Sequence, residues 1–168
     1  HYNTRQMKEI ITKSAIDTKK LAEKFAKNLL RDRVSNSRKK ATVIGLKGEL
    51  GGGKTTFIQG IAKGLGVKER ITSPTFVIFK KYKIPDTKYQ IQNTNFYHID
   101  CYRLSKPKDL MDLDFKEILS QPQNIIAIEW ADKVRRILPE NIFWIEFQWI
   151  DDNKRRLIFT FSFFNFNL

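Results

Sequence analysis

The pattern of hydrophobic and polar residues predicts a helix near the start of the chain, then a loop and a strand. Between positions 17 and 30, apolar side chains recur every three or four residues, which predicts an amphipathic helix that begins at Asp17 or Thr18. The charged stretch 31–40 is typical of a loop. The run ATVIGLKG at 41–48 is rich in β-branched residues and predicts a short buried strand.

The remaining pattern mixes strands with helices and ends in two strands. Helices are predicted over 54–65 and 108–120, and strands over 76–84, 95–104, 124–130, 141–150 and 155–164. The turn DDNK at 151–154 joins the last two strands into an antiparallel hairpin. We therefore predict a single α/β domain over 1–168, with a sheet flanked by helices. Residues 1–6 are expected to be disordered or foreign to that domain.

The chain of 168 residues carries a net charge of +13, which affects the range of expected partners. A basic surface attracts nucleic acid, anionic lipid or acidic protein. Lysine is spread along the whole chain, however, so a compositional bias without any binding role explains the charge equally well. Both alternatives stay open on the sequence alone.

Cysteine content and hydropathy narrow the expected location. Cys101 is the only cysteine, which excludes an intrachain disulfide and a cysteine-rich zinc site. A single thiol fits the reducing cytosol, so we expect a cytoplasmic protein. No apolar run is long enough for a transmembrane helix, and we expect no membrane partner.

The glycines are confined to one short part of the chain. All 8 lie between Gly45 and Gly66, and GELGGGKT at 48–55 fits the phosphate-loop pattern GxxxxGK[ST]. Glycines allow positive φ angles and let successive backbone N–H groups point at phosphate oxygens. The loop leads into the amino end of a predicted helix, which carries partial positive charge. This predicts a phosphate-binding loop; the alternative is a glycine-rich turn that only links strand and helix.

The residues that follow the glycines fit a nucleoside triphosphate with magnesium. Lys54 would reach the β- and γ-phosphates, the hydroxyl of Thr55 would bind Mg²⁺, and Thr56 can face the α-phosphate. No glycine follows Gly66, which excludes the DxxG switch of Ras-type GTPases and the glycine-rich signature of transporter ATPases. No NKxD motif for guanine is present either. ATP is favoured over GTP by this elimination.

Two further stretches place polar side chains at strand ends. SPTF at 73–76 offers the hydroxyl of Thr75, and its alternative is an ordinary junction between a loop and a strand. IIAIEW at 125–130 ends an apolar strand in Glu129, which could bind Mg²⁺ or order water. The alternative for Glu129 is a charge at a strand end that reaches solvent.

A third stretch, HIDCYR at 98–103, alternates polar side chains along a predicted strand. His98, Asp100 and Tyr102 would share one face, and Asp100 at a carboxyl end can meet Mg²⁺ beside a phosphate loop. A metal site formed by His98 and Asp100 is a rival interpretation with few nearby partners. A solvated edge strand is the plainest alternative.

These motifs occur together in one known family. GELGGGKTTF at 48–57, SPTF at 73–76, HIDCYRL at 98–104 and EW at 129–130, in this order and spacing, resemble TsaE. TsaE is the small ATPase of bacterial tRNA threonylcarbamoyladenosine (t6A) biosynthesis. The resemblance covers nearly the whole chain. It implies a P-loop NTPase-like α/β sheet with an antiparallel addition, and a role in modifying tRNAs that read codons beginning with adenine.

The resemblance also implies roles for individual residues. ATP would bind to Gly51, Gly52 and Gly53, and onward through Lys54 to Thr56. Mg²⁺ would be held by Thr55 and Glu129.

Residues outside the phosphate loop are implied as well. Asp100 would orient the metal or its waters, and Thr75 would sense the γ-phosphate in a switch-like loop. Trp130 would lie near the nucleotide. An arginine of the last hairpin would touch the nucleotide; we assign it to Arg155, with Lys154 and Arg156 as rivals. A weaker contact is implied near the first helix, at Ser14.

Some positions depart from the family pattern. Glu49 stands where the family usually has Asp, and Gly52 stands where it usually has Ala. Both changes are mild, although the longer side chain leaves the role of Glu49 open. The connector 80–95 is long and rich in lysine, so no family contact is transferred to it.

In the family the tRNA chemistry belongs to the partners TsaD and TsaB. TsaE binds their heterodimer, tRNA is met through the complex, and ATP hydrolysis supports repeated turnover. The resemblance therefore implies a Mg²⁺-dependent ATPase that is slow alone and depends on partners. The residues agree with this, because no nucleophile is paired with a base and no catalytic arginine is identifiable; Arg103 is no more than a candidate.

Two other functions remain as alternatives. A P-loop small-molecule kinase would need an acceptor pocket and usually an arginine-bearing lid, and no such lid is found in the sequence. A non-catalytic ATP-binding adaptor would use the nucleotide only to change its affinity for partners. The presence of Asp100 and Glu129 counts mildly against the adaptor.

Overall fold

A seven-stranded mixed sheet forms the centre of the computed structural model, which describes residues 5–49, 51–72, 79–85, 93–162 and 168. The strands are β1 (Arg5–Thr12), β2 (Thr42–Gly48), β3 (Phe79–Lys83), β4 (Asn95–Asp100), β5 (Ile125–Glu129), β6 (Phe143–Trp149) and β7 (Arg155–Ser162). Their order across the sheet is β1-β7-β6-β2-β5-β4-β3.

Four adjacent strands, β6, β2, β5 and β4, are parallel, and the strands next to this group, β7 and β3, are antiparallel to it. β2 pairs in parallel with β5 and β6, and β5 pairs in parallel with β4. β3 pairs antiparallel with β4 on one side, and β7 pairs antiparallel with β6 on the other; β1 pairs antiparallel with β7 at the edge of the sheet. The carboxyl ends of β2, β4 and β5 therefore meet at one edge of the sheet, which is where α/β proteins of this kind bind ligands.

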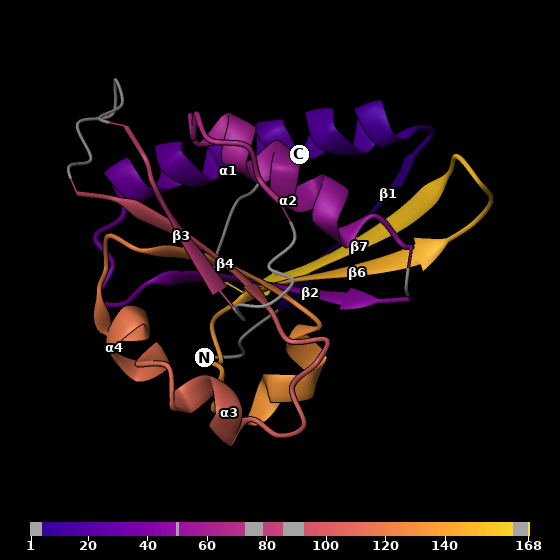
Figure 1. Ribbon diagram of the computed structural model, residues 1–168. Helices are drawn as coiled ribbons and strands as arrows, with labels where there is room; N and C mark the ends of the chain where they lie inside the picture. Colours follow the sequence, from indigo (N-terminus) through magenta and orange to yellow (C-terminus); the bar gives the residue numbers. More distant parts are fainter. Residues whose placement is uncertain (1–4, 50, 73–78, 86–92, 163–167) are drawn as a thin grey trace.

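Helices cover the two faces of the sheet in separate groups (Figure 1). On one face lie α1 (Ala15–Ser35) and α2 (Lys54–Gly64), which pack against each other. On the other face lie α3 (Lys108–Met111), α4 (Phe115–Ser120) and the 3-10 helix η1 (Ala131–Ile137). Alternation along the central strands produces two cores, because Ile44 faces the first group and Val43 faces the second.

Aromatic side chains dominate the core beneath α1 and α2. Phe25 of α1 has its ring centroid 5.9 Å from that of Phe57 in α2, and 5.6 Å from that of Phe143 in β6. Phe57 in turn meets Phe147 of β6 edge-on at 5.5 Å. Such ring pairs add to the stabilisation from burial, and here they fix α2 over β6 and β2.

The predicted fold class is confirmed. An α/β sheet is flanked by helices, and β6 and β7 form the predicted antiparallel C-terminal hairpin. The predicted strand at 41–48 and the predicted helix at 54–65 match β2 and α2 closely. Of the predicted strand 76–84, the described part contains β3, and residues 76–78 lie outside it.

The prediction from the sequence lacked the first strand and made the first helix too short. β1 includes Arg5 and Gln6, which were expected to lie outside the domain, and its strand conformation comes from pairing with β7 along its whole length. α1 begins one residue after Ser14, whose side chain accepts the N–H of Asp17 at 3.0 Å. It continues to Ser35 through residues expected to form a loop, because exposed charged side chains are compatible with a helix.

Two later predictions are also corrected. The single helix predicted over 108–120 is two short helices, since Asp114 has a φ of 58° and interrupts it. The strand predicted over 95–104 ends at Asp100, whose carboxylate accepts the N–H of Tyr102 in a turn. Tyr102 therefore does not share a strand face with His98. The edge-strand alternative is wrong, because β4 lies between β3 and β5 and His98 is fully buried.

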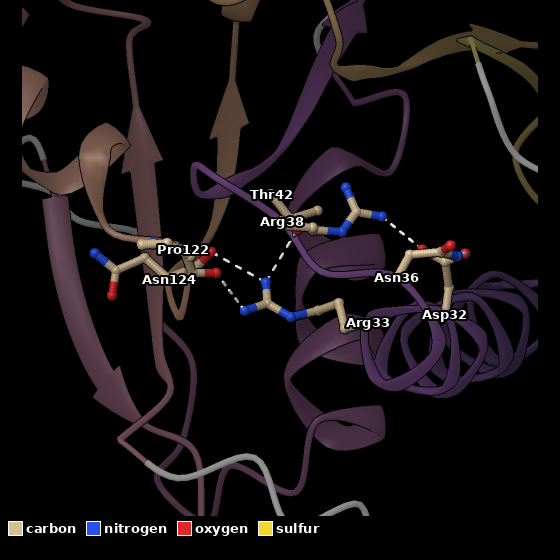
Figure 2. A network of polar contacts seen from close by, with 7 residues as sticks. All are labelled: Asp32, Arg33, Asn36, Arg38, Thr42, Pro122 and Asn124. Atoms are coloured by element: carbon tan, nitrogen blue, oxygen red, sulfur yellow. Dashed lines mark hydrogen bonds and ion pairs between the residues drawn. The ribbon is translucent and has the colours of Figure 1, made fainter.

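Arg33 ties the carboxyl end of α1 to the amino ends of β2 and β5 (Figure 2). Its guanidinium donates to the hydroxyl of Thr42 at 2.9 Å, and to the carbonyls of Asn124 at 3.2 Å and Pro122 at 2.6 Å. Burial lowers the pKa of Arg33 to about 10. This network lies at the opposite end of β2 from the glycines, so it supports the sheet rather than the candidate site.

Within the described ranges, every helix is too short or too polar to cross a membrane.

Candidate functional site

The loop between β2 and α2 requires its glycines. It comprises residues 48–53, of which Leu50 is not among the described residues. We call it the glycine loop. Gly48, Gly51 and Gly53 have φ angles of 127°, 76° and 96°, which side chains rarely tolerate. A Cβ on Gly48 would also lie 2.1 Å from the carbonyl oxygen of Phe147. Gly53 directly precedes α2, so the loop ends at the positive end of a helix.

Lys54 is the first residue of α2 and is largely buried beneath the glycine loop. Its ammonium donates to the carbonyls of Gly48 at 2.9 Å and Glu49 at 2.7 Å. It also lies 4.1 Å from the ring centroid of Trp130, within reach of a cation–π interaction. Burial lowers the pKa of Lys54, and the nearby carboxylates of Glu129 and Asp132 oppose that effect.

Glu129 ends β5 and has a defined partner for each carboxylate oxygen. Oε1 accepts a hydrogen bond from Oγ1 of Thr55 at 2.7 Å, and Oε2 lies 2.7 Å from Nε2 of His98. The residue is only 3% exposed. Glu129 is therefore held between the first turn of α2 and strand β4, and it does not reach freely into solvent as the plain alternative required.

Asp100 ends β4 directly beside Glu129, its partner in the parallel register. Burial raises the pKa of the Asp100 carboxyl, while the hydrogen bond from the N–H of Tyr102 acts in the opposite direction. Two carboxylates, a lysine ammonium and a threonine hydroxyl thus converge at one edge of the sheet. Hard oxygen ligands of this kind suit Mg²⁺, and the ammonium suits phosphate.

These groups line one cavity of about 360 Å³. Its lining residues are Gly51, Gly52, Gly53, Lys54, Thr55, Thr56, Asp100, Tyr102, Glu129 and Trp130. The volume lies within the usual range of about 300–1,000 Å³ for ligand pockets. Nine of these ten residues were selected from the sequence, and Tyr102 was not expected to line the cavity.

Arg155 lies beside the glycine loop. Its Nε donates to the carbonyl of Gly51 at 3.2 Å. The rivals have other partners, since Lys154 lies 3.9 Å from the carboxylate of Asp151 and Arg156 lies 2.8 Å from that of Glu9 on β1. Arg155 is thus the residue of the three that the structure brings to the loop.

Three other sequence-selected residues have different outcomes. Thr75 lies outside the described residues, so its role stays a prediction. Ser14 caps α1 and does not belong to the cavity lining. Arg103 is likewise absent from the described lining.

The rival metal site of His98 and Asp100 gains no support. In the ranges that the structure describes, no group of three or more histidine, cysteine, aspartate or glutamate residues is arranged to hold a metal ion. The Nε2 atom of His98 is already engaged by Glu129. The oxygens of Thr55 and Glu129 fit Mg²⁺ better, as partial ligands that a phosphate and water would complete.

Sequence reasoning missed two features of this site, the ring of Tyr102 and the contact between His98 and Glu129. The ring centroid of Tyr102 lies 5.2 Å from that of Trp130, so the two form an aromatic wall of the cavity. The only sequence signal for the His98 contact was its position two residues before Asp100.

Comparisons with known proteins identify a family for the chain. The profile of the family described as "Threonylcarbamoyl adenosine biosynthesis protein TsaE" matches residues 12–157. The chain is 35% identical over 140 residues to the tRNA threonylcarbamoyladenosine biosynthesis protein TsaE of Rickettsia typhi, covering 83% of this chain and 85% of that protein. It is 35% identical over 153 residues to the protein of the same name from Aquifex aeolicus, covering 90% and 94%.

A solved structure resembles the whole fold. The crystal structure of Bacillus subtilis YdiB superposes with a TM-score of 0.68 at 29% identity, covering 95% of this chain and 88% of the other. The family profile spans most of the chain and includes the glycine loop, both acidic strand ends and the start of the hairpin. The chain therefore belongs to the TsaE family of t6A biosynthesis.

Proposed function

We propose that this member of the t6A pathway binds and hydrolyses ATP with Mg²⁺, and that it does so in a complex with TsaD and TsaB. The observation that carries the proposal is the convergence of Lys54, Thr55, Asp100 and Glu129 on one cavity beneath the glycine loop. A phosphate chain would find backbone donors, an ammonium and metal-binding oxygens there together.

The glycine loop and Lys54 would bind the phosphates. The N–H groups of Gly51 to Thr56 would surround the β-phosphate, at the positive end of α2. Lys54 would exchange its two loop carbonyls for phosphate oxygens, which offer a full negative charge. Because burial already lowers its pKa, the desolvated ammonium gains more from an anion than an exposed lysine would.

Thr55 and Glu129 would hold the metal, and Asp100 would orient its water ligands. Both Thr55 and Glu129 line the cavity beside the glycine loop, so they would hold a cation next to the bound phosphates. When bound, Mg²⁺ would neutralise charge on the transferred phosphoryl group. Either Asp100 or Glu129 would also position the attacking water. The nucleotide would lie against the aromatic wall of Tyr102 and Trp130 and against the side chain of Arg155.

The partners follow from the family rather than from this chain alone. Hydrolysis would be slow for the isolated protein, because Lys54 lines the cavity but no arginine is among its described lining residues. TsaD and TsaB would accelerate it, and tRNA would be met through their complex. A cytoplasmic location stays a prediction from the single cysteine.

Phosphate release from ATP tests the proposal. The protein is assayed alone and with purified TsaD–TsaB from the same organism, with Lys54→Ala as the inactive variant. Lys47→Ala is a matched control, since Lys47 lies on β2 just before the loop but pairs with Glu146 at 3.4 Å and does not line the cavity. We expect strong stimulation by the partners, loss in Lys54→Ala and normal turnover in Lys47→Ala.

The opposite results would separate the alternatives. ATP binding without stimulation, together with phosphorylation of a metabolite, would favour the small-molecule kinase. Nucleotide-dependent partner binding without multiple-turnover hydrolysis would favour the adaptor. Unchanged ATP affinity in Lys54→Ala would reject the phosphate-loop assignment itself.

A further inference from the structure

His98 is a buried polar residue that the proposed chemistry does not use. It lies on β4 and is 0% exposed. The register pairs His98 with Ala127, so Glu129 lies two residues further along the neighbouring strand. Phe96 and Ala127 both face the core beneath α1 and α2, and strand alternation places His98 and Glu129 on that same face. The imidazole is therefore enclosed between the sheet and α2.

The hydrogen bonds of His98 are directed at one group. Its Nε2 lies 2.7 Å from Oε2 of Glu129. Its Nδ1 is buried and has no hydrogen-bond partner among the residues that the structure describes. A histidine kept only for the core would gain more from an apolar side chain of similar size, because burying an unpaired ring nitrogen costs free energy. Glu129 is thus the contact that accounts for a histidine at this position.

The carboxylate of Glu129 needs such a contact. With Thr55 on Oε1 and His98 on Oε2, both oxygens are engaged and the plane of the carboxylate is fixed. Without the imidazole N–H, Oε2 would be a buried anionic oxygen lacking a donor, and the side chain would rotate towards solvent. Rotation would take Oε1 away from Thr55, which is the other proposed metal ligand.

We propose that His98 is a positioning residue that holds Glu129 in the orientation required to bind Mg²⁺ with Thr55. It donates Nε2–H to Oε2 and leaves Oε1 directed at Thr55 and the metal. This is the role that groups behind the ligands have in many metal sites, where their removal lowers metal affinity. The inference rests on the proposed function, because it assumes that Thr55 and Glu129 hold the metal.

Three substitutions distinguish positioning from packing. His98→Leu removes the donor and retains an apolar volume. His98→Gln can place its amide Nε2 near the position of the imidazole Nε2, whereas His98→Asn reaches only the position of Nδ1, which has no described partner. For each variant, Mn²⁺ affinity is measured by electron paramagnetic resonance with a non-hydrolysable ATP analogue. ADP affinity in EDTA and the melting temperature are measured beside it.

Positioning predicts a selective loss of metal binding. In His98→Leu and His98→Asn, Mn²⁺ affinity should fall by about 10- to 100-fold, and His98→Gln should recover most of it. Metal-free ADP affinity should stay unchanged in all three variants, which a general disturbance of the site would not allow.

Other outcomes overturn the inference. Wild-type Mn²⁺ affinity in a folded His98→Leu variant would show that Glu129 needs no support. Equal losses in His98→Gln and His98→Asn would exclude the Nε2 donor, and loss of folding in all three would assign His98 to the core. If the wild-type protein binds neither ATP nor Mn²⁺, the proposed function fails and this inference fails with it.

Discussion

The hydroxyl of Thr55 donates a 2.7 Å hydrogen bond to Oε1 of Glu129, across 74 residues of sequence. Thr55 lies in the first turn of α2, and Glu129 is the last residue of β5. β2 leads into α2 through the glycine loop and pairs in parallel with β5, so the two residues meet where both strands end. The contact joins the phosphate-binding part of the cavity to its acidic part.

The first prediction is that Thr55 and Glu129 act as one unit in metal binding. Thr55→Ala and Glu129→Gln should each raise the half-saturating Mg²⁺ concentration by at least about tenfold. The double variant should lose less than the sum, with a coupling of about 0.5–3 kcal/mol, because either change breaks the same contact. Titration of ATPase activity with Mg²⁺ measures this, beside ADP affinity in EDTA, which should change much less.

Glu146→Gln serves as the control for that cycle. Glu146 lies on β6 and pairs with Lys47 at 3.4 Å, outside the cavity. Its variant should keep the wild-type Mg²⁺ dependence. Strictly additive effects of Thr55→Ala and Glu129→Gln would mean that the two residues do not share a metal.

A second prediction concerns the stability cost of Asp100. Burial raises the pKa of its carboxyl above the usual value, so the native state disfavours the ionised form. The stability that this group contributes is present below the ordinary aspartate pKa of about 3.9, and it is lost as pH rises through the higher native pKa. Asp100→Asn should therefore be more stable than wild type at pH 7.5, and the difference should shrink towards pH 4.5.

Urea unfolding at the two pH values measures this difference, and Asp109→Asn is the control of opposite sign. A hydrogen bond from Ser105 lowers the pKa of the exposed Asp109 carboxyl, so that residue contributes stability above the ordinary pKa and loses it in acid. Asp109→Asn should thus be destabilised at pH 7.5. A stability difference for Asp100→Asn that does not depend on pH would refute the assigned cause.

Much of the fold was accessible from the sequence because its signals are local. The glycine loop is specified by consecutive residues. Apolar strands directly precede Asp100 and Glu129, which predicts that each acid lies at a strand end. Parallel strands then bring those ends together without further information. Eight of the ten lining residues of the cavity could be chosen in this way, and Trp130 followed from the resemblance to TsaE.

The missed features depend on contacts that are distant in sequence. β1 is a strand because β7 pairs with it, and the partner of His98 is decided by the register of β4 against β5. The interruption at Asp114 breaks a sequence with good helical periodicity, so tertiary packing overrides propensity there. No local pattern could reveal any of the three.

Not every glycine between Gly45 and Gly66 belongs to the glycine loop. Gly60 and Gly64 are outside the cavity lining and lie on α2 where it packs against α1. A Cβ on Gly60 would lie 2.5 Å from the carbonyl oxygen of Lys19 and 2.6 Å from Cβ of Ala22. The two helices approach this closely only because the side chain is absent.

The third prediction follows from that approach. Gly60→Ala should gain about 1 kcal/mol of helix propensity. Overpacking in a tight contact costs about 1–3 kcal/mol, and a backbone carbonyl of α1 cannot move aside. We expect a net loss of up to about 2 kcal/mol in the free energy of unfolding. Urea unfolding measures it, with Lys63→Ala, an exposed change on the same helix, as the control. A stabilised Gly60→Ala variant would show that the helices can separate.

The fourth prediction is that Arg33 supports stability without affecting the site. Arg33→Leu removes three hydrogen bonds; the Pro122 carbonyl loses this donor, and the Asn124 carbonyl keeps only the N–H of Thr42. A loss of about 3 kcal/mol is expected, which for a chain of this size lowers the melting temperature by about 6–12 °C. The melting temperature of Arg33→Lys should lie between those of Arg33→Leu and the wild type, since lysine retains the charge but not the planar fork that reaches both carbonyls.

Arg31→Ala is the matched control, because Arg31 lies on the same turn of α1 and is exposed. Its melting temperature should stay close to that of the wild type. At temperatures where all variants are folded, ATP and Mg²⁺ affinity should be equal in every one, because the network lies at the amino ends of β2 and β5 and the cavity at their carboxyl ends. Weaker nucleotide binding in a folded Arg33→Leu variant would show that α1 transmits strain through the sheet to the glycine loop.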